Sequence, residues 1–179
     1  MSIKIENLKS DHLSRLKEFC DREIGRNYFT LEFLRDFIEL NNSSKFNPSF
    51  IALNDEEIVG IRLTYPPGLK PGLSDSYSFK LDEIAYFQSL FIKKDFQKSG
   101  LGSLLTSLSI EVLKRLGVKA ILSHSHKESE NNSSVKYFFK NGFSPLKEIN
   151  NYWAAIDYDC PSCNLKPCTC TAIEMFKEI

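Results

Sequence analysis

The chain has 179 residues, 42% of them hydrophobic and 26% charged, with equal numbers of acidic and basic side chains and a formal net charge of zero. This balance is typical of a folded globular domain, and it carries no electrostatic signature of a nucleic-acid-binding or membrane-surface protein. No apolar run approaches the roughly 20 residues of a membrane span, and the N-terminus lacks the apolar core of a signal peptide, so we expect a cytoplasmic protein.

Hydrophobic periodicity divides the chain into strands and helices. Apolar runs or alternation predict strands at 3–8, 49–54, 57–65, 83–92, 119–126 and 151–158. Apolar residues three and four apart predict helices at 10–24, 30–40, 101–117 and 131–143. This order predicts an α/β (α+β) fold: a mixed, mostly antiparallel sheet of about six to seven strands with helices on both faces. We expect residues 1–158 to form one domain and residues 159–179 a cysteine-rich tail of the same compact unit.

A glycine-containing segment, QKSGLG at residues 97–102, lies between a predicted strand and the start of a predicted helix. The first turn of a helix leaves backbone N–H groups unpaired, and the helix dipole adds partial positive charge there. Glycines at 100 and 102 let a ligand approach the backbone. The segment therefore predicts a seat for a phosphate or pyrophosphate. The alternative is a tight strand-to-helix turn with glycines for geometry alone.

The pattern Q-x-x-G-x-G in this segment is neither a Walker loop nor the dinucleotide-binding G-x-G-x-x-G. It resembles the acetyl-CoA signature of the GNAT superfamily of N-acetyltransferases. Asn131 and the sequence YFFKNGF at 137–143 resemble a later helix of that family, and the similarity spans roughly residues 3–158. The resemblance implies direct transfer of acetyl from acetyl-CoA to an amine of a small molecule or peptide. The alternative is a catalytically inactive acyl-CoA-binding or partner-docking module.

The resemblance also implies where acetyl-CoA binds. The pantetheine arm would lie in a V between the strand ending near Ile92 and the strand 119–126, and the pyrophosphate would lie on the N–H groups of the glycine segment. A backbone N–H near Leu90 would polarise the thioester carbonyl. The expected cofactor-binding residues are Leu90, Phe91, Ile92, Gln97, Lys98, Ser99, Gly100, Leu101, Gly102, Ser103, Asn131 and Phe138.

The residues that would transfer protons follow the family pattern less closely. The family often has a Tyr four residues before the Gly of a Gly-Phe pair, which is Gly142-Phe143 here. Phe138 occupies that position, and Tyr137 is turned about 100° away from it around the helix. A family Glu often lies about eleven residues before the motif Gln; that position is Tyr86, with Glu83 on the opposite strand face.

Two further residues complete the candidates for proton transfer. Gln88 shares a strand face with Tyr86, and His124 shares one with His126 at the strand end that faces the V. Histidine titrates near neutral pH and makes a suitable base, although packed aromatic or exposed strand-end roles are the alternatives for these residues. The candidate catalytic residues are Tyr86, Gln88, His124, Glu83 and Tyr137.

Four cysteines in the tail, Cys160, Cys163, Cys168 and Cys170, form the pattern C-x2-C-x4-C-x-C. Four thiolates suit tetrahedral zinc, and a reducing compartment favours metal over disulfides. We therefore predict structural zinc, with a disulfide or redox pair, free thiols or another metal as alternatives. The ordinary GNAT pattern lacks this tail, which would close the acceptor side of the site or mediate a homodimer.

The acceptor itself is not encoded in any motif that we can read. The Pro- and Gly-rich loop 66–82 and the helix 30–40 are expected to wall the acceptor side. The cysteine-rich tail has few lysines, no arginine and acidic neighbours, which argues against a nucleic-acid partner. The expected partners are acetyl-CoA and an amine.

Overall fold

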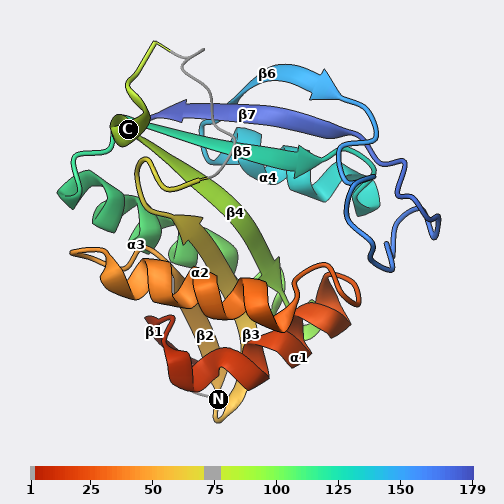
Figure 1. The fold of residues 1–179 in the computed structure, drawn as a ribbon, viewed down its shortest axis with the longest axis horizontal. Helices are drawn as coiled ribbons and strands as arrows, with labels where there is room; N and C mark the ends of the chain where they lie inside the picture. The colour runs from red at the N-terminus through yellow and green to blue at the C-terminus, as the bar shows by residue number, and fades with distance from the viewer. Residues whose placement is uncertain (1–2, 71–77) are drawn as a thin grey trace.

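The structure is a computed structural model that describes residues 3–70 and 78–179. Seven strands form one sheet in the order β1-β2-β3-β4-β5-β7-β6 (Figure 1). All neighbouring strands are antiparallel except β4 and β5, which are parallel. The strands are β1 (Ile3–Asn7), β2 (Phe50–Asn54), β3 (Glu57–Tyr65), β4 (Ile84–Ile92), β5 (Ala120–His126), β6 (Ser144–Ile149) and β7 (Ala172–Glu178). The predicted mixed, mostly antiparallel sheet is confirmed.

Helices cover both faces of the sheet, as predicted. In Figure 1, α1 and α2 lie in front of the sheet, and α3 and α4 lie behind it. The four α-helices are α1 (Leu13–Glu23), α2 (Leu31–Ser43), α3 (Leu101–Arg115) and α4 (Ser133–Lys140). Short 3₁₀ turns lie at Ser10–His12, Leu81–Glu83, Lys94–Phe96 and Glu130–Asn132.

The apolar stripes of the helices supply the core on each face. Leu16 and Phe19 of α1 and Leu34 of α2 are almost fully buried against the sheet. On the opposite face, Leu101 and Leu105 of α3 pack against the inner strands. Each helix is therefore held by burial of one face, and this packing fixes the ends of the strands that carry the site.

Strands β4 and β5 form the predicted V. Their parallel pairing runs only from Ile84 opposite Ala120 to Phe87 opposite Ser123, and the strands then diverge (Figure 1). The pairing of β4 with β3 shifts at the same level, which leaves Gln88 in a bulge. A bulge bends its strand and increases its twist. The bend accounts for the opening of the sheet between β4 and β5.

The predicted strand at 151–158 is wrong. These residues form turns, and the last strand is β7, which inserts between β5 and β6. Trp153 and Tyr158 are buried, but they pack with three of the tail cysteines and Ala172 rather than in a sheet. The edge strand β6 is largely exposed and has no apolar alternation to reveal it.

Two further predictions concern the acceptor-side loop and membrane-spanning helices. Of the predicted acceptor-side loop 66–82, residues 71–77 lie outside the described residues. Among the residues that the structure describes, none of the helices has the length and apolar character needed to cross a membrane.

Candidate functional site

The joint between β4 and α3 presents backbone N–H groups toward the mouth of the V. Lys98 and Gly100 have left-handed φ angles of 60° and 86°, which turn the chain into the helix. Within the described residues, the N–H groups of Gly102 and Ser103 have no hydrogen-bond partner, and Leu104 is the first to bond inside the turn, to the Gly100 carbonyl at 3.0 Å. This unpaired first turn, with its partial positive charge, suits an anion.

Side chains of the joint hold its backbone in place. Gln97 donates from Nε2 to the Ile92 carbonyl at 2.9 Å, and Ser99 donates from Oγ to the Phe96 carbonyl at 2.6 Å. A Cβ at Gly100 would meet no atom within 4 Å, whereas one at Gly102 would lie 3.4 Å from Leu90 Cδ2. The joint is therefore rigid and open on its outer side, with room for a ligand against the backbone.

The end of β4 divides its side chains between the two faces of the sheet. Leu90 and Ile92 pack with α3, whereas Phe91 packs with the α1 and α2 side. Among the residues that the structure describes, none pairs as a strand with β4 on its β5 side beyond Phe87. An unpaired strand edge is where an extended group can add as a further strand.

A cluster of hydroxyl and imidazole groups lies where β4 and β5 separate. The hydroxyl of Tyr86 in β4 lies 2.8 Å from His124 Nδ1 in β5, and the hydroxyl of Tyr152 lies 3.1 Å from the same nitrogen. His124 Nε2 faces the carboxylate of Glu174 in β7 at 3.7 Å. This arrangement favours the tautomer that carries its proton on Nε2 and leaves Nδ1 as an acceptor.

Burial sets the protonation of this cluster. Desolvation lowers the pKa of His124 to about 4, although the charge of Glu174 opposes the shift. Desolvation raises the pKa of Tyr86 well above its ordinary value. At neutral pH the imidazole is therefore uncharged and the phenol protonated, which gives a proton acceptor joined by a hydrogen bond to a neutral donor.

A cavity of about 620 Å³ opens beside this cluster. Its walls come from the α1–α2 connection, the ends of β3, β4 and β5, and the β6–β7 connection. Most of the wall is aromatic, with Lys70 and Asp157 as its charged members. Burial lowers the pKa of Lys70, whose Nζ lies 5.0 Å from the centre of the Tyr86 ring. The aromatic lining residues are Tyr28, Phe29, Phe33, Tyr65, Tyr86, Tyr152 and Trp153.

The structure brings together three of the five predicted catalytic residues. Tyr86, Gln88 and His124 all line the cavity. Glu83 lies in the turn before β4, where its carboxylate accepts from the Lys80 N–H at 3.1 Å, and it is not part of the cavity wall. Tyr137 points toward α3 and donates to the Gly102 carbonyl at 3.3 Å.

The remaining predicted residues lie apart from the hydroxyl and imidazole cluster. Phe138 is 6% exposed and packs edge-on against Phe143 in the core. Asn131 is exposed, with a left-handed φ of 54°, in the turn before α4. His126 packs edge-on against Trp153, and its Nε2 lies 3.7 Å from Glu128.

Sequence reasoning missed Arg62, a fully buried residue of β3 with no carboxylate partner among the described residues. Its Nη2 donates to Thr106 Oγ1 at 2.8 Å and to the Tyr137 hydroxyl at 3.2 Å. Its guanidinium lies 4.2 Å from the centre of the Phe87 ring. A single charge inside the apolar run IVGIRLTY was the signal available in the sequence.

Tyr152 and Glu174 were also missed, because no motif or periodicity links their positions to His124. Tyr152 lay in the segment interpreted as a strand. Glu174 is only 4% exposed and lies opposite His124 in the β5–β7 pairing. Its position depends on β7, which sequence periodicity did not reveal.

The four tail cysteines meet within the β6–β7 connection, as their spacing predicts. All four Sγ atoms lie within 4.8 Å of one another. The Sγ–Sγ distances are 3.8 Å between Cys160 and Cys170 and 3.7 Å between Cys163 and Cys168, and no disulfide joins them.

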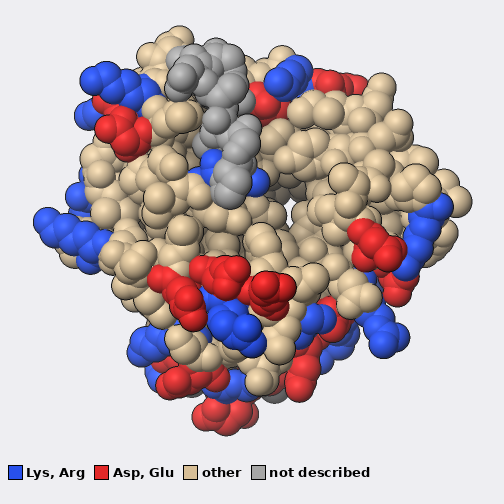
Figure 2. All heavy atoms as spheres, viewed as in Figure 1, with Lys and Arg blue, Asp and Glu red and all other residues tan. Residues whose placement is uncertain are grey.

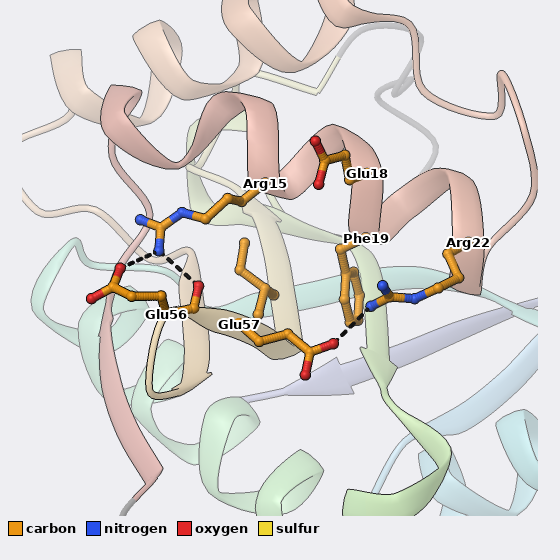
Figure 3. Close-up of a pocket in the computed structure, with 7 residues that line it drawn as sticks. Arg15, Glu18, Phe19, Arg22, Glu56 and Glu57 are labelled. Atoms are coloured by element: carbon orange, nitrogen blue, oxygen red, sulfur yellow. Dashed lines mark hydrogen bonds and ion pairs between the residues drawn. The ribbon is translucent and has the colours of Figure 1, made fainter.

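A smaller cavity of about 300 Å³ lies between α1 and the β2–β3 turn (Figure 3). Arg15 donates to the Glu56 carboxylate at 2.8 Å, and Arg22 lies 3.4 Å from the Glu57 carboxylate. Its arginines are thus paired with its own carboxylates, and none of the predicted site residues lies there. The larger aromatic cavity is the stronger candidate for a functional site.

Comparisons with known proteins agree with this geometry. The model of the acetyltransferase (GNAT) family matches residues 13–143, which is most of the chain, so the protein belongs to the GNAT family. A search of curated proteins found no match.

Solved structures of similar fold include several acetyltransferases. Arabidopsis thaliana NAA60 in complex with acetyl-CoA has a TM-score of 0.75 and 14% identity over 99% of each chain. Arabidopsis thaliana Naa50 in complex with the bisubstrate analogue CoA-Ac-MVNAL has a TM-score of 0.70 and 16% identity over 100% of each chain. The ribosomal-protein-S18-alanine N-acetyltransferase from Escherichia coli has a TM-score of 0.67 and 16% identity. The match covers 99% of this chain and 94% of that enzyme. At these identities the likeness shows the fold.

Proposed function

We propose that the protein is an acetyl-CoA-dependent N-acetyltransferase that transfers acetyl directly to an amine, and that the free N-terminus of a peptide is its favoured acceptor. The observation that carries the proposal is the Tyr86–His124 hydrogen bond of 2.8 Å at the opening of the V, beside the aromatic cavity. Support for a peptide acceptor comes from the similar fold of the enzyme whose bound analogue joins CoA to the peptide MVNAL.

The binding of acetyl-CoA follows from the joint and the open edge of β4. The pyrophosphate lies against the N–H groups of Gly102 and Ser103, next to Gly100, where the space beside the backbone is open. The pantetheine arm adds to the unpaired edge of β4 at Leu90 to Ile92. This arm directs the thioester toward the bulge at Gln88, and the acceptor amine enters from the aromatic cavity.

The chemistry needs one proton acceptor near the amine. An ammonium group must lose a proton before its nitrogen attacks the thioester carbonyl carbon. Neutral His124 takes that proton at Nδ1, with the Tyr86 hydroxyl relaying it along the existing hydrogen bond. The new C–N bond forms, the C–S bond breaks, and CoA leaves as a thiolate. The remaining proton that the nitrogen loses on becoming an amide protonates this thiolate.

Two measurements on the full-length protein test the proposal in order. Calorimetric titration with acetyl-CoA and with CoA is expected to give saturable binding to both. The rate of CoA release is then measured with three amines: a peptide with a free N-terminus, the same peptide with a blocked N-terminus, and a polyamine. We expect turnover with the first peptide and none with the second.

Each failure has a different meaning. Binding without turnover on any amine favours an inactive acyl-CoA-binding module, for which the Phe at position 138 and the distant Glu83 are the motivating observations. Turnover with the polyamine alone contradicts the peptide acceptor. No binding of either nucleotide means that the joint is only a turn.

A further inference from the structure

We propose that Cys160, Cys163, Cys168 and Cys170 bind one Zn²⁺ ion, and that this ion holds the β6–β7 connection in place as a wall of the acceptor cavity. The metal site stands on the cysteine geometry alone. Its effect on the acceptor rests on the proposed function.

The sulfur positions match the geometry of a tetrathiolate zinc site. A Zn–S bond of about 2.3 Å in a tetrahedron places neighbouring sulfurs about 3.8 Å apart. The recorded distances are 3.8 Å for Cys160–Cys170 and 3.7 Å for Cys163–Cys168, and all four sulfurs lie within 4.8 Å. A disulfide would need about 2.0 Å. Four thiolates complete the coordination of zinc, so the site is structural, with no open position for a substrate.

The surroundings of the sulfurs are those of a closed metal site. Cys160, Cys168 and Cys170 are 3%, 1% and 2% exposed. The Tyr158 hydroxyl lies 3.4 Å from Cys168 Sγ, and a donor of this kind orients and stabilises a thiolate ligand. The Asn164 N–H closes a turn onto the Cys160 carbonyl at 3.0 Å, which brings the first cysteine pair to one side of the site.

The connection that carries these cysteines needs a cross-link. Residues 150–171 contain no helix or strand, and connections of this length without secondary structure are uncommon in compact domains. Ordering each residue costs about 1–2 kcal/mol of conformational entropy. Its buried cluster is small, consisting chiefly of the cysteines with Trp153, Tyr158 and Ala172. Metal ligation supplies the stabilisation that such a small core lacks.

Short contacts connect the cysteine cluster with the acceptor cavity. The Tyr152 N–H donates to the Cys170 carbonyl at 3.1 Å, and the same residue places its hydroxyl 3.1 Å from His124 Nδ1. Trp153 donates from Nε1 to the Tyr28 hydroxyl at 3.0 Å across the cavity wall. Zinc at the cysteines therefore fixes two aromatic side chains against which the acceptor would lie.

The β6–β7 connection also packs closely against the α1–α2 connection. The Asp159 N–H donates to the Arg26 carbonyl at 3.1 Å. A Cβ at Gly25, whose φ is 140°, would lie 2.5 Å from the Asp159 carbonyl oxygen. The two connections that form the walls of the cavity are thus held together next to the cysteine cluster.

A second grouping of potential ligands is present nearby. His126 and Glu128 lie with Cys170 in a set whose ligand atoms are also within 4.8 Å of one another. The two sets share Cys170, so one ion excludes the other. Four thiolates are the softer and more complete set for zinc.

The first test is metal analysis of the purified full chain, with Cys163→Ser/Cys168→Ser as the disrupted variant. We expect one zinc per chain in the wild type and none in the variant. Cys20→Ser is the matched control, because Cys20 is the fifth cysteine and lies buried in α1 away from the cluster; it should retain zinc. Cobalt substitution should give a charge-transfer band with the intensity of four thiolates. Retention of metal by the double variant, or a band of one thiolate, would overturn the assignment.

The second test uses Trp153, which is the only tryptophan in the chain and is 7% exposed. Removal of zinc by a chelator should shift its emission to longer wavelength as the connection loosens. Readdition of zinc should reverse the shift. An unchanged emission spectrum after complete metal removal would show that the ion does not hold the connection.

The third test separates this inference from the proposed function. Chelation should leave the Kd for acetyl-CoA within about twofold, because Leu90 and Ile92 of the proposed CoA site pack with α3 rather than with the connection. It should raise the peptide KM tenfold or more. An unchanged KM in the zinc-free enzyme would overturn the role of zinc at the acceptor wall. If the protein transfers no acetyl at all, the zinc content and the Trp153 emission still decide the metal site.

Discussion

Among single side chains, Tyr86 and His124 are the two on which the proposed function depends most. Both were predicted from strand faces, and the structure joins them through one hydrogen bond. A buried neutral imidazole with a low pKa remains available as an acceptor across the physiological pH range. The two residues are expected to act as one unit rather than as independent groups.

Substitution of this pair should abolish most of the activity without affecting cofactor binding. Tyr86→Phe and His124→Gln are each expected to lower kcat about 100-fold or more, the usual contribution of a positioned base. The double variant should be little worse than either single variant, because residues that act as a unit are not additive. Steady-state kinetics and calorimetry with acetyl-CoA check both statements. Additive losses in the double variant would argue against a relay.

The low pKa of His124 also predicts how stability depends on pH. The folded-state pKa of about 4 lies below the ordinary 6.5, so between these values the unfolded chain binds a proton that the folded chain does not. Stability is therefore lost as the pH falls from about 6.5 to about 4, by up to about 3 kcal/mol. Urea unfolding at pH 7.5 and pH 5 should show a smaller difference for His124→Gln than for the wild type. Equal differences would contradict the shift.

Substitution of Gly100 tests the proposed anion-binding site at the joint. Gly100→Glu is expected to weaken acetyl-CoA binding about 100-fold, because it places a negative side chain at the proposed position of the pyrophosphate. Gly117→Glu is the matched control: Gly117 lies at the other end of α3, also has a left-handed φ, 81°, and would likewise meet no atom within 4 Å. Both variants carry the same backbone strain, so comparable loss of affinity in both would mean that the seat is misplaced.

Where elements meet, Arg62 joins β3 to α3 and α4. Its only oxygen acceptors among the described residues are the hydroxyls of Thr106 and Tyr137, and its Nε is buried without a partner. A buried charge that loses an acceptor is costly, because its desolvation is no longer offset. The hydroxyl of Tyr137 is thus engaged in holding two helices to the sheet.

Tyr137→Phe should accordingly reduce stability more than catalysis. We expect a loss of about 1–3 kcal/mol in the free energy of unfolding, since Arg62 and the Gly102 carbonyl each lose a partner. We expect kcat to fall less than tenfold. Denaturant unfolding and steady-state kinetics measure the two effects. A loss of kcat as large as that of Tyr86→Phe, with unchanged stability, would give Tyr137 a direct role in catalysis.

The predicted elements differ in how well periodicity revealed them. The four helices and the first five strands were recognisable because each buries one face or both faces of a repeating pattern. β6 is an exposed edge strand, and β7 follows directly after the cysteine-rich connection, so neither stands out. The aromatic residues at 152–158 read as a strand although they pack in an irregular loop around the cysteines.

Taken as one unit, the protein assembles its candidate site from segments far apart in sequence. The α1–α2 connection, β4, β5, the β6–β7 connection and β7 all contribute side chains near His124. The centre of the face seen in Figure 2 is mostly uncharged, with charges of both signs around it. Under the proposed function, the aromatic lining of the cavity favours an acceptor recognised by contact with aromatic rings.

The sequence alone led to the cofactor joint but only partly to the acceptor side. The joint is a local motif, and a local motif can be recognised from the sequence without knowledge of the fold. Tyr152 and Glu174 reach His124 only through the insertion of β7 between β5 and β6, which is a long-range feature. Lys70 enters the cavity from a Pro- and Gly-rich loop whose path no periodicity describes.

The most direct test of the account is a single-turnover experiment. Wild-type protein saturated with acetyl-CoA is mixed with a peptide that has a free N-terminus, and acetylated peptide and free CoA thiol are measured against time. The account predicts that both products appear together at equal yield, and that Tyr86→Phe, with unchanged acetyl-CoA affinity, forms them about 100-fold more slowly. Bound acetyl-CoA that stays intact in the wild type, or equal rates in the two proteins, would contradict it.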